Sequence, residues 1–81
     1  MKIAVGGDHA GFPMKAPVVE HLKSLGHKVT DHGTHSEDPV DFPDIAQKVT
    51  AAILSGEADR GVLVCGTGVG AAIAGNKVPG I

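Results

Sequence analysis

The chain has 81 residues, of which 42% are hydrophobic and 20% are charged, and its net charge at pH 7 is −2. This composition is typical of one small globular domain and excludes a disordered or fibrous chain. The sequence has no run of Lys or Arg, so we expect neither nucleic acid nor an anionic membrane among its partners.

Cys65 is the single cysteine, so no internal disulfide can form. The apolar start of the chain, residues 1–5, is too short for a signal peptide or a membrane span. We therefore expect a protein of the reducing cytoplasm. Aromatic residues are limited to two Phe, so the core must consist of Val, Ile, Leu and Ala, which suits a parallel sheet covered by helices.

The first half of the chain predicts a strand, a helix and a second strand. A short apolar run over residues 3–5, closed by two glycines, predicts a buried strand. Residues 27–31 predict the second strand. Between them, helical spacing predicts a helix that ends at Gly26, and its apolar face would consist of Met14, Val18, Leu22 and Leu25.

The second half predicts a helix, a strand and a further helix. Apolar positions from Ile45 to Ile53 indicate a helix that ends near residues 55–56, with Asp41 or Asp44 as its cap. Residues 61–64 are the clearest strand of the sequence, and Cys65 stands at its end. A glycine-rich loop over residues 66–70 then leads into a third helix from residue 71.

This alternation predicts an α/β fold whose parallel strands all end at one edge of the sheet. We expect the strand order 2-1-3, in which the first and third strands are neighbours. Residues 77–81 indicate a turn that leads toward a fourth strand. Because three parallel strands would leave an edge and apolar faces uncovered, we expect residues 1–81 to be a single, truncated domain of a longer protein.

Gly66, Gly68 and Gly70 alternate in the loop before the third helix. Successive amides in such a loop, together with the helix N-terminus, can form a concave anion site. A tight turn without a ligand is the alternative. The spacing matches neither a P-loop nor a cysteine phosphatase loop, and it matches a dinucleotide fingerprint only weakly.

Cys65 precedes this loop, where the positive end of a helix favours the thiolate and provides a base or nucleophile. A buried, inert cysteine is the alternative. Asp8 and His9 follow the first strand, and the order 2-1-3 would bring them to Cys65 and Thr67 at a topological switch point. Ordinary loop or capping roles are the alternative for both.

His32 and His35 have a spacing that could hold a metal ion, but two histidines alone do not complete a zinc site. We therefore predict no metal site.

Five short motifs occur in a fixed order along the chain. Together they resemble the ribose-5-phosphate isomerase B family over the whole chain. The motifs are Gly7-Asp8-His9-Ala10-Gly11 with Lys15, Asp31-His32-Gly33-Thr34, Asp41-Phe42-Pro43, Cys65-Gly66-Thr67-Gly68-Val69-Gly70, and Ala74-Gly75-Asn76-Lys77.

The resemblance implies a Rossmann-like three-layer α/β/α domain and a homodimer or homotetramer. It also implies an aldose–ketose isomerase of the pentose phosphate pathway that works without metal or cofactor. Such an enzyme interconverts ribose 5-phosphate and ribulose 5-phosphate through an enediolate. Galactose 6-phosphate or allose 6-phosphate is the alternative substrate within the family, and a non-catalytic module that binds phosphorylated sugars is the alternative outside it.

The resemblance further implies roles for individual residues. Cys65 would be the base, with Thr67 beside it, and Asp8 and His9 would contact substrate hydroxyls and phosphate. The enediolate oxygens would be held by loop amides, those of Gly66, Gly68, Val69 and Gly70. Two features depart from the family: Phe42 stands where Tyr is usual, and the family's ring-opening histidine and phosphate-binding arginines belong to a C-terminal half that this sequence does not contain.

Overall fold

The computed structural model describes residues 1–33 and 42–81. Its sheet has three parallel strands, β1 (Lys2–Gly7), β2 (Lys28–Asp31) and β3 (Arg60–Val64). The helices α1 (Phe12–Ser24), α2 (Phe42–Leu54) and α3 (Val69–Asn76) alternate with these strands along the chain. The strand order is β2-β1-β3, which confirms the predicted topology.

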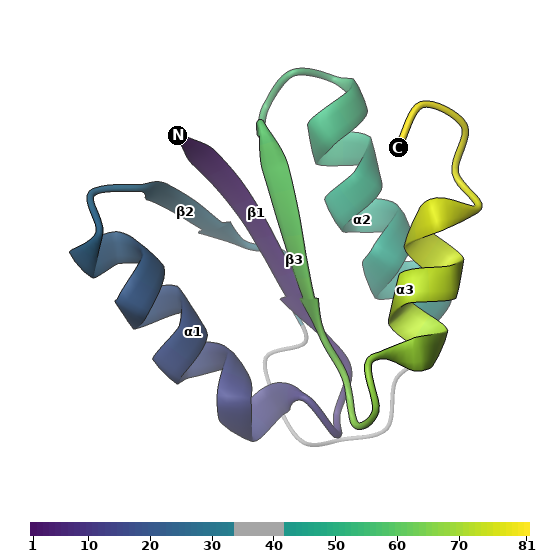
Figure 1. The fold of residues 1–81 in the computed structure, drawn as a ribbon, viewed down its shortest axis with the longest axis horizontal. Helices are drawn as coiled ribbons and strands as arrows, with labels where there is room; N and C mark the ends of the chain where they lie inside the picture. Colours follow the sequence, from purple (N-terminus) through teal and green to yellow (C-terminus); the bar gives the residue numbers. More distant parts are fainter. Residues whose placement is uncertain (34–41) are drawn as a thin grey trace.

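Helices cover both faces of the sheet (Figure 1). From β1 the chain moves to β2 on one side, and from β2 it returns past β1 to β3 on the other. Right-handed crossovers in opposite directions place their helices on opposite faces, so α1 packs on one face while α2 packs on β1 and β3 from the other. The third helix packs chiefly against α2. The predicted three-layer arrangement is confirmed.

The core lies between the sheet and α2. Ala4 and Val5 of the central strand are completely buried, and Val49 of α2 is 1% exposed. The amphipathic pattern of α2 explains this packing, because Ile45, Val49 and Ala52 recur at helical spacing and all three are buried. The helix therefore rests along β1 and β3.

Several element boundaries differ from the sequence prediction. The third helix begins at Val69, so the last two residues of the predicted loop already belong to its first turn. Asp44 lies inside the first turn of α2 and is not its cap, while Asp41 lies outside the described residues. Gly26 and Gly56 have φ angles of +90° and +85°, as expected of glycines that end helices.

The buried face of α1 also differs from the predicted one. Met14 and Leu25, both expected on the apolar face, are 59% and 60% exposed, whereas Lys15 is only 4% exposed. The first turn of α1 therefore directs a lysine toward the sheet.

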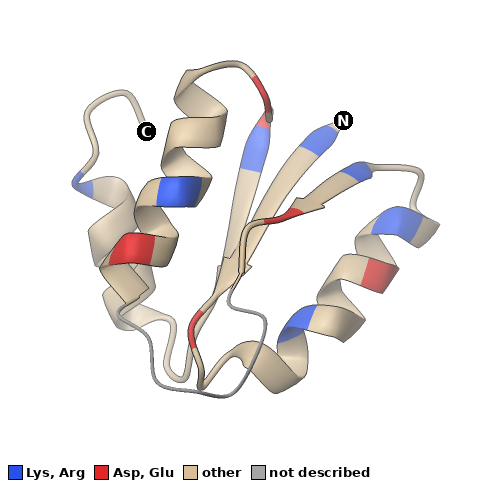
Figure 2. Cartoon of the chain, turned by 180° about the vertical axis from the view of Figure 1, so that it is seen from behind, with Lys and Arg blue, Asp and Glu red and all other residues tan. Residues whose placement is uncertain are grey.

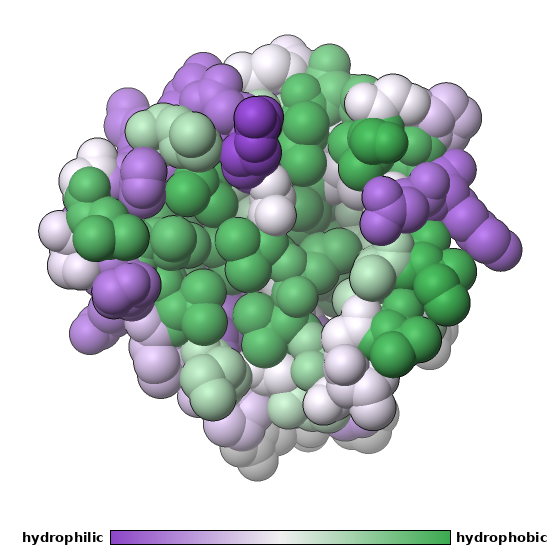
Figure 3. Space-filling model, viewed as in Figure 1, coloured by the Kyte–Doolittle hydropathy of each residue, from purple (hydrophilic) through white to green (hydrophobic). Residues whose placement is uncertain are grey.

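Strand β3 is an edge strand of the described sheet, and its last three residues are half-buried. Apolar side chains form a broad patch over the middle of the face shown in Figure 3, where Figure 1 places β3 between the helices. Residues 77–80 form the predicted turn, and no strand follows it within the described residues.

Acidic and basic segments are interspersed on the strands and helices (Figure 2). None of the helices that the structure describes combines the length and the hydropathy needed to span a bilayer.

Candidate active site

Two loops meet at the carboxyl edge of the sheet. Gly7 of β1 is paired in register with Val64 of β3, so Asp8 and Cys65 are the next residues on two neighbouring strands. The Asp8 N–H donates to the Val64 carbonyl at 3.2 Å. A Cβ on Gly11 would lie 2.1 Å from the same oxygen, so the first loop crosses β3 at a distance that only glycine allows. The predicted meeting of these strand ends is therefore observed.

Asp8 is 8% exposed, and its Oδ1 accepts the Gly11 N–H at 2.8 Å. This bond closes the turn that leads into α1, so the carboxylate has a structural role whatever else it contacts. His9 is exposed in the same turn. Both residues stand at the edge of the sheet that Cys65 also reaches.

The thiol of Cys65 is free and half-buried. Its Sγ accepts the Gly68 N–H at 3.0 Å, so the side chain turns into the loop that follows it. An N–H donor and a helix N-terminus both stabilise negative charge on an acceptor atom. The thiol is thus held against the start of α3.

The loop after Cys65 turns sharply at Gly68, whose φ of +83° is favourable only for glycine and which caps α3. The Val69 N–H donates to the Thr67 hydroxyl oxygen at 3.3 Å. Two amides of the predicted anion site are therefore engaged by side chains of the loop itself. The amides of Gly66, Thr67 and Gly70 have no acceptor within residues 1–33 and 42–81.

Phe42, the first residue of α2, lies against this helix start. A Cβ on Gly70 would lie 2.7 Å from Cζ of the ring. The same two residues line a largely apolar groove of about 600 Å³ between α2 and α3, which Ile73, Lys77 and Pro79 also line. Phe42 therefore forms a wall next to the loop and offers no hydroxyl there.

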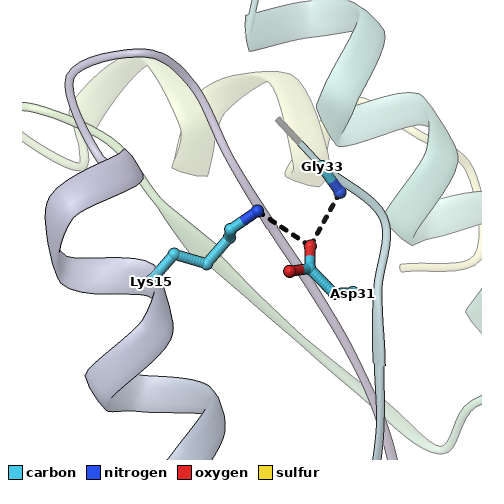
Figure 4. A network of polar contacts seen from close by, with 3 residues as sticks. All are labelled: Lys15, Asp31 and Gly33. Carbon is cyan, nitrogen blue, oxygen red and sulfur yellow. Dashed lines mark hydrogen bonds and ion pairs between the residues drawn. The ribbon is translucent and has the colours of Figure 1, made fainter. Parts of the chain in front are cut away.

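Figure 4 shows a polar network between α1 and the end of β2 to which the sequence prediction assigned no role. Lys15 Nζ donates to Asp31 Oδ1 at 2.9 Å, and the Gly33 N–H donates to the same oxygen at 2.9 Å. The Gly33 carbonyl in turn accepts the Gly7 N–H at 2.6 Å. In the sequence, Lys15, Asp31 and Gly33 stood out only as members of two of the motifs that carry the family resemblance.

Among the residues that the structure describes, no group of three or more His, Cys, Asp or Glu side chains is arranged to hold a metal ion. His32 is half-buried just after β2. His35, its predicted companion, lies outside the described ranges.

The family model for Ribose/Galactose Isomerase matches residues 3–81 of the chain. Ribose-5-phosphate isomerase B of Escherichia coli K12 is 50% identical over 80 residues, which are 99% of this chain and 54% of that protein. Galactose-6-phosphate isomerase subunit LacB of Clostridium acetobutylicum is 43% identical over 81 residues, which are 100% of this chain and 47% of that protein. The chain thus spans about half the length of the curated relatives it matches.

A solved structure gives the same result for the fold. The ribose-5-phosphate isomerase B of Clostridium thermocellum superposes with a TM-score of 0.96 at 52% identity, covering 100% of this chain and 55% of that one.

Proposed function

We propose that this chain, which belongs to the ribose/galactose isomerase family, carries the proton-transfer residues of an enzyme that interconverts ribose 5-phosphate and ribulose 5-phosphate. One observation carries the proposal: Cys65 Sγ lies at the end of β3 beside the first turn of α3, with the Gly68 N–H 3.0 Å away. A base next to a set of unengaged amides is what enediolate chemistry requires.

In the proposed reaction, the Cys65 thiolate removes the proton from C2 of the open-chain aldose. The electron pair moves onto the carbonyl oxygen, and the resulting enediolate is held by the amides of Gly66 and Gly70. Transfer of the O2 hydroxyl proton to O1 and return of the base's proton to C1 then give the ketose, whose carbonyl is at C2. The reaction relocates hydrogen within the sugar, so it needs no external oxidant. Gly68 and Val69 shape the loop, because their amides are bonded to Cys65 and Thr67.

Asp8 and His9 are proposed to contact the substrate hydroxyls and phosphate. Their loop packs directly against the glycine loop, since a Cβ on Gly66 would lie 3.4 Å from the Ala10 methyl. A sugar held across both loops would therefore meet groups that follow the neighbouring strands β1 and β3. Such a position, at the reversal of strand order, is where ligands bind in open α/β sheets.

The test is turnover of ribose 5-phosphate in D₂O by the protein that the complete reading frame encodes. Proton NMR should show ribulose 5-phosphate with deuterium in part of the C1 position, because a side-chain base exchanges its proton with solvent. Sugar that keeps all its protons at every stage of conversion would indicate a hydride shift and contradict the role of Cys65. Binding without any turnover would instead support a non-catalytic phosphosugar module.

A second substrate class is favoured by one comparison, the 43% identity to a galactose-6-phosphate isomerase subunit. Galactose 6-phosphate and allose 6-phosphate are larger than ribose 5-phosphate, and Phe42 stands at the wall of the groove next to the loop. A comparison of kcat/KM for the three sugars separates these alternatives. We propose that kcat/KM for ribose 5-phosphate will exceed kcat/KM for either hexose phosphate by at least about tenfold.

We also propose that the complete protein is a cytoplasmic homodimer or homotetramer. The exposed apolar side chains on α3, Val69 at 62% and Ile73 at 54%, support an assembly that covers them. Light scattering of the purified protein measures its mass in solution, and a monomer at all concentrations would contradict this part of the proposal.

A further inference from the structure

Lys15 is a buried charge that the proposed chemistry does not use. Only 5% of its side chain is exposed, and lysine is almost never this buried unless it is paired. Its ammonium lies 2.9 Å from Asp31 Oδ1 and 5.6 Å from the centroid of the Phe12 ring. Burial of a lysine costs free energy, and such partners only offset that cost. We therefore ask what the buried ammonium in the first turn of α1 does for the structure.

The partner of Lys15 is placed at the end of β2. Asp31 is the last residue of that strand, and its Oδ1 accepts hydrogen bonds from both Lys15 Nζ and the Gly33 N–H. One oxygen therefore joins α1 to the turn that follows β2. Figure 4 shows the lysine reaching from α1 toward this turn, with the Gly33 amide on the far side of the carboxylate.

The turn after β2 is in direct contact with the candidate active site. The Gly33 carbonyl accepts the Gly7 N–H at 2.6 Å, and Gly7 immediately precedes Asp8. The stem of Lys15 also passes over this point, since a Cβ on Gly7 would lie 3.7 Å from Lys15 Cδ. The chain of contacts thus runs from Lys15 through Asp31 and Gly33 to the end of β1.

We propose that Lys15 is a positioning residue for the sugar-phosphate site: by holding Asp31 and the Gly33 turn, it fixes the end of β1 from which Asp8 and His9 project. The expected effect on catalysis rests on the proposed function. The expected effect on the position of Asp8 and His9 does not. A displacement of substrate-positioning groups by about 1 Å can lower the rate of an enzyme about 10²-fold.

Lys15→Met removes the ammonium and keeps most of the apolar stem, whereas Lys15→Arg keeps a donor for Asp31. Asp31→Asn removes the charge but keeps an oxygen acceptor for Gly33. Lys23→Met is the matched control, because Lys23 lies on the same helix and is exposed. All four variants are made in the protein that the complete reading frame encodes. Each is characterised by amide NMR without ligand and by the kinetics of ribose 5-phosphate turnover.

We expect Lys15→Met to shift the amide resonances of Gly33, Gly7, Asp8 and His9, and to raise KM about tenfold while kcat changes by less than about threefold. Lys15→Arg should return KM to near the value of the unsubstituted protein. Lys23→Met should change neither KM nor the amide resonances of Gly33, Gly7, Asp8 and His9. Amide shifts confined to α1, with KM unchanged, would overturn the proposal. If Lys15→Met does not fold, Asp31→Asn decides by the same two readouts, because it removes the charge that pairs with Lys15; the proposal then predicts the same amide shifts and a raised KM for Asp31→Asn, and their absence overturns it.

The two proposals fail in different ways. If the unsubstituted protein does not turn over ribose 5-phosphate, the proposed function fails. The amide shifts at Gly7, Asp8 and His9 then still decide whether Lys15 positions this edge of the sheet, and their absence overturns that inference.

Discussion

The ring of Phe42 rests on the α-carbon of Gly70, so closely that a Cβ there would lie 2.7 Å from Cζ and about equally near both Cε atoms, at 3.1 and 3.2 Å. This contact joins the first residue of α2 to the first turn of α3. Because α3 packs chiefly against α2, the contact fixes the helix start that follows Cys65.

Gly70→Ala should destabilise the protein by about 1–3 kcal/mol, because the new methyl group must displace the Phe42 ring. Gly75→Ala is the matched control in the same helix, where a Cβ would meet Leu63 at an ordinary 3.5 Å. This second change should stabilise by about 0.5–1 kcal/mol, because alanine loses less conformational entropy in a helix. Urea denaturation measures both. Equal effects of the two substitutions would show that the ring moves aside without cost.

Cys65→Ala should lower turnover of ribose 5-phosphate by about 10²–10⁴-fold, the usual range for the loss of a positioned base. The free energy of unfolding should change little, since the thiol is half-buried and makes one hydrogen bond in the described structure. Cys65→Ser keeps an acceptor for the Gly68 N–H and tests whether geometry alone suffices. Turnover by Cys65→Ala close to that of the unsubstituted protein would eliminate Cys65 as the base.

Substitutions of Asp8 separate its two roles. Asp8→Ala removes the acceptor of the Gly11 N–H and should cost about 1–2 kcal/mol of stability. Asp8→Asn keeps an oxygen for that bond and removes only the charge, so it should retain most of the stability. A fall in kcat/KM for Asp8→Asn, measured beside thermal unfolding, would support a substrate contact. An unchanged kcat/KM would restrict Asp8 to its structural role.

Gly11→Ala should cost more than about 3 kcal/mol, a loss typical of severe steric conflict. The added Cβ would lie 2.1 Å from the Val64 carbonyl oxygen and 2.5 Å from its carbon, and backbone atoms of a paired strand cannot move aside easily. Gly66→Ala provides the comparison, because its Cβ would stand 3.4 Å from the Ala10 methyl. Chemical denaturation should rank the two far apart, and a stable Gly11→Ala protein would contradict the described path of the first loop.

The order of elements and the strand topology could be predicted because strong local signals agreed with a general rule of handedness. Apolar runs at residues 3–5 and 61–64 marked the neighbouring strands β1 and β3. The rule for crossovers then brought their ends together. The fold followed from the pattern, and the motifs identified the family.

The buried face of α1 could not be predicted in the same way. Met14 fits an apolar stripe by spacing, yet it is exposed, while Lys15 turns inward. Periodicity assigns apolar residues to a buried face, but a charge can take that place when a partner stands opposite. The partner, Asp31, lies on a different element, and no local pattern indicates it.

The loop after Cys65 was predicted in kind but not in detail. The glycines correctly indicated a tight loop at a helix start, but the Cys65 thiol and the Thr67 hydroxyl accept hydrogen bonds from two of the amides that were expected to bind an anion. Whether a nearby side chain accepts a loop N–H depends on the rotamer of that side chain, and the sequence alone does not determine the rotamer.

The hydrogen bond from the Asp8 N–H to the Val64 carbonyl joins residues that are 56 positions apart, the difference between 64 and 8. A contact of this kind forms only after a long segment has been closed, which is entropically costly and makes folding slow. Neither loop can acquire its shape ahead of the sheet. Protection of that amide against hydrogen exchange should therefore follow global unfolding, and binding competence should appear in the same kinetic phase as the completed β1–β3 pair.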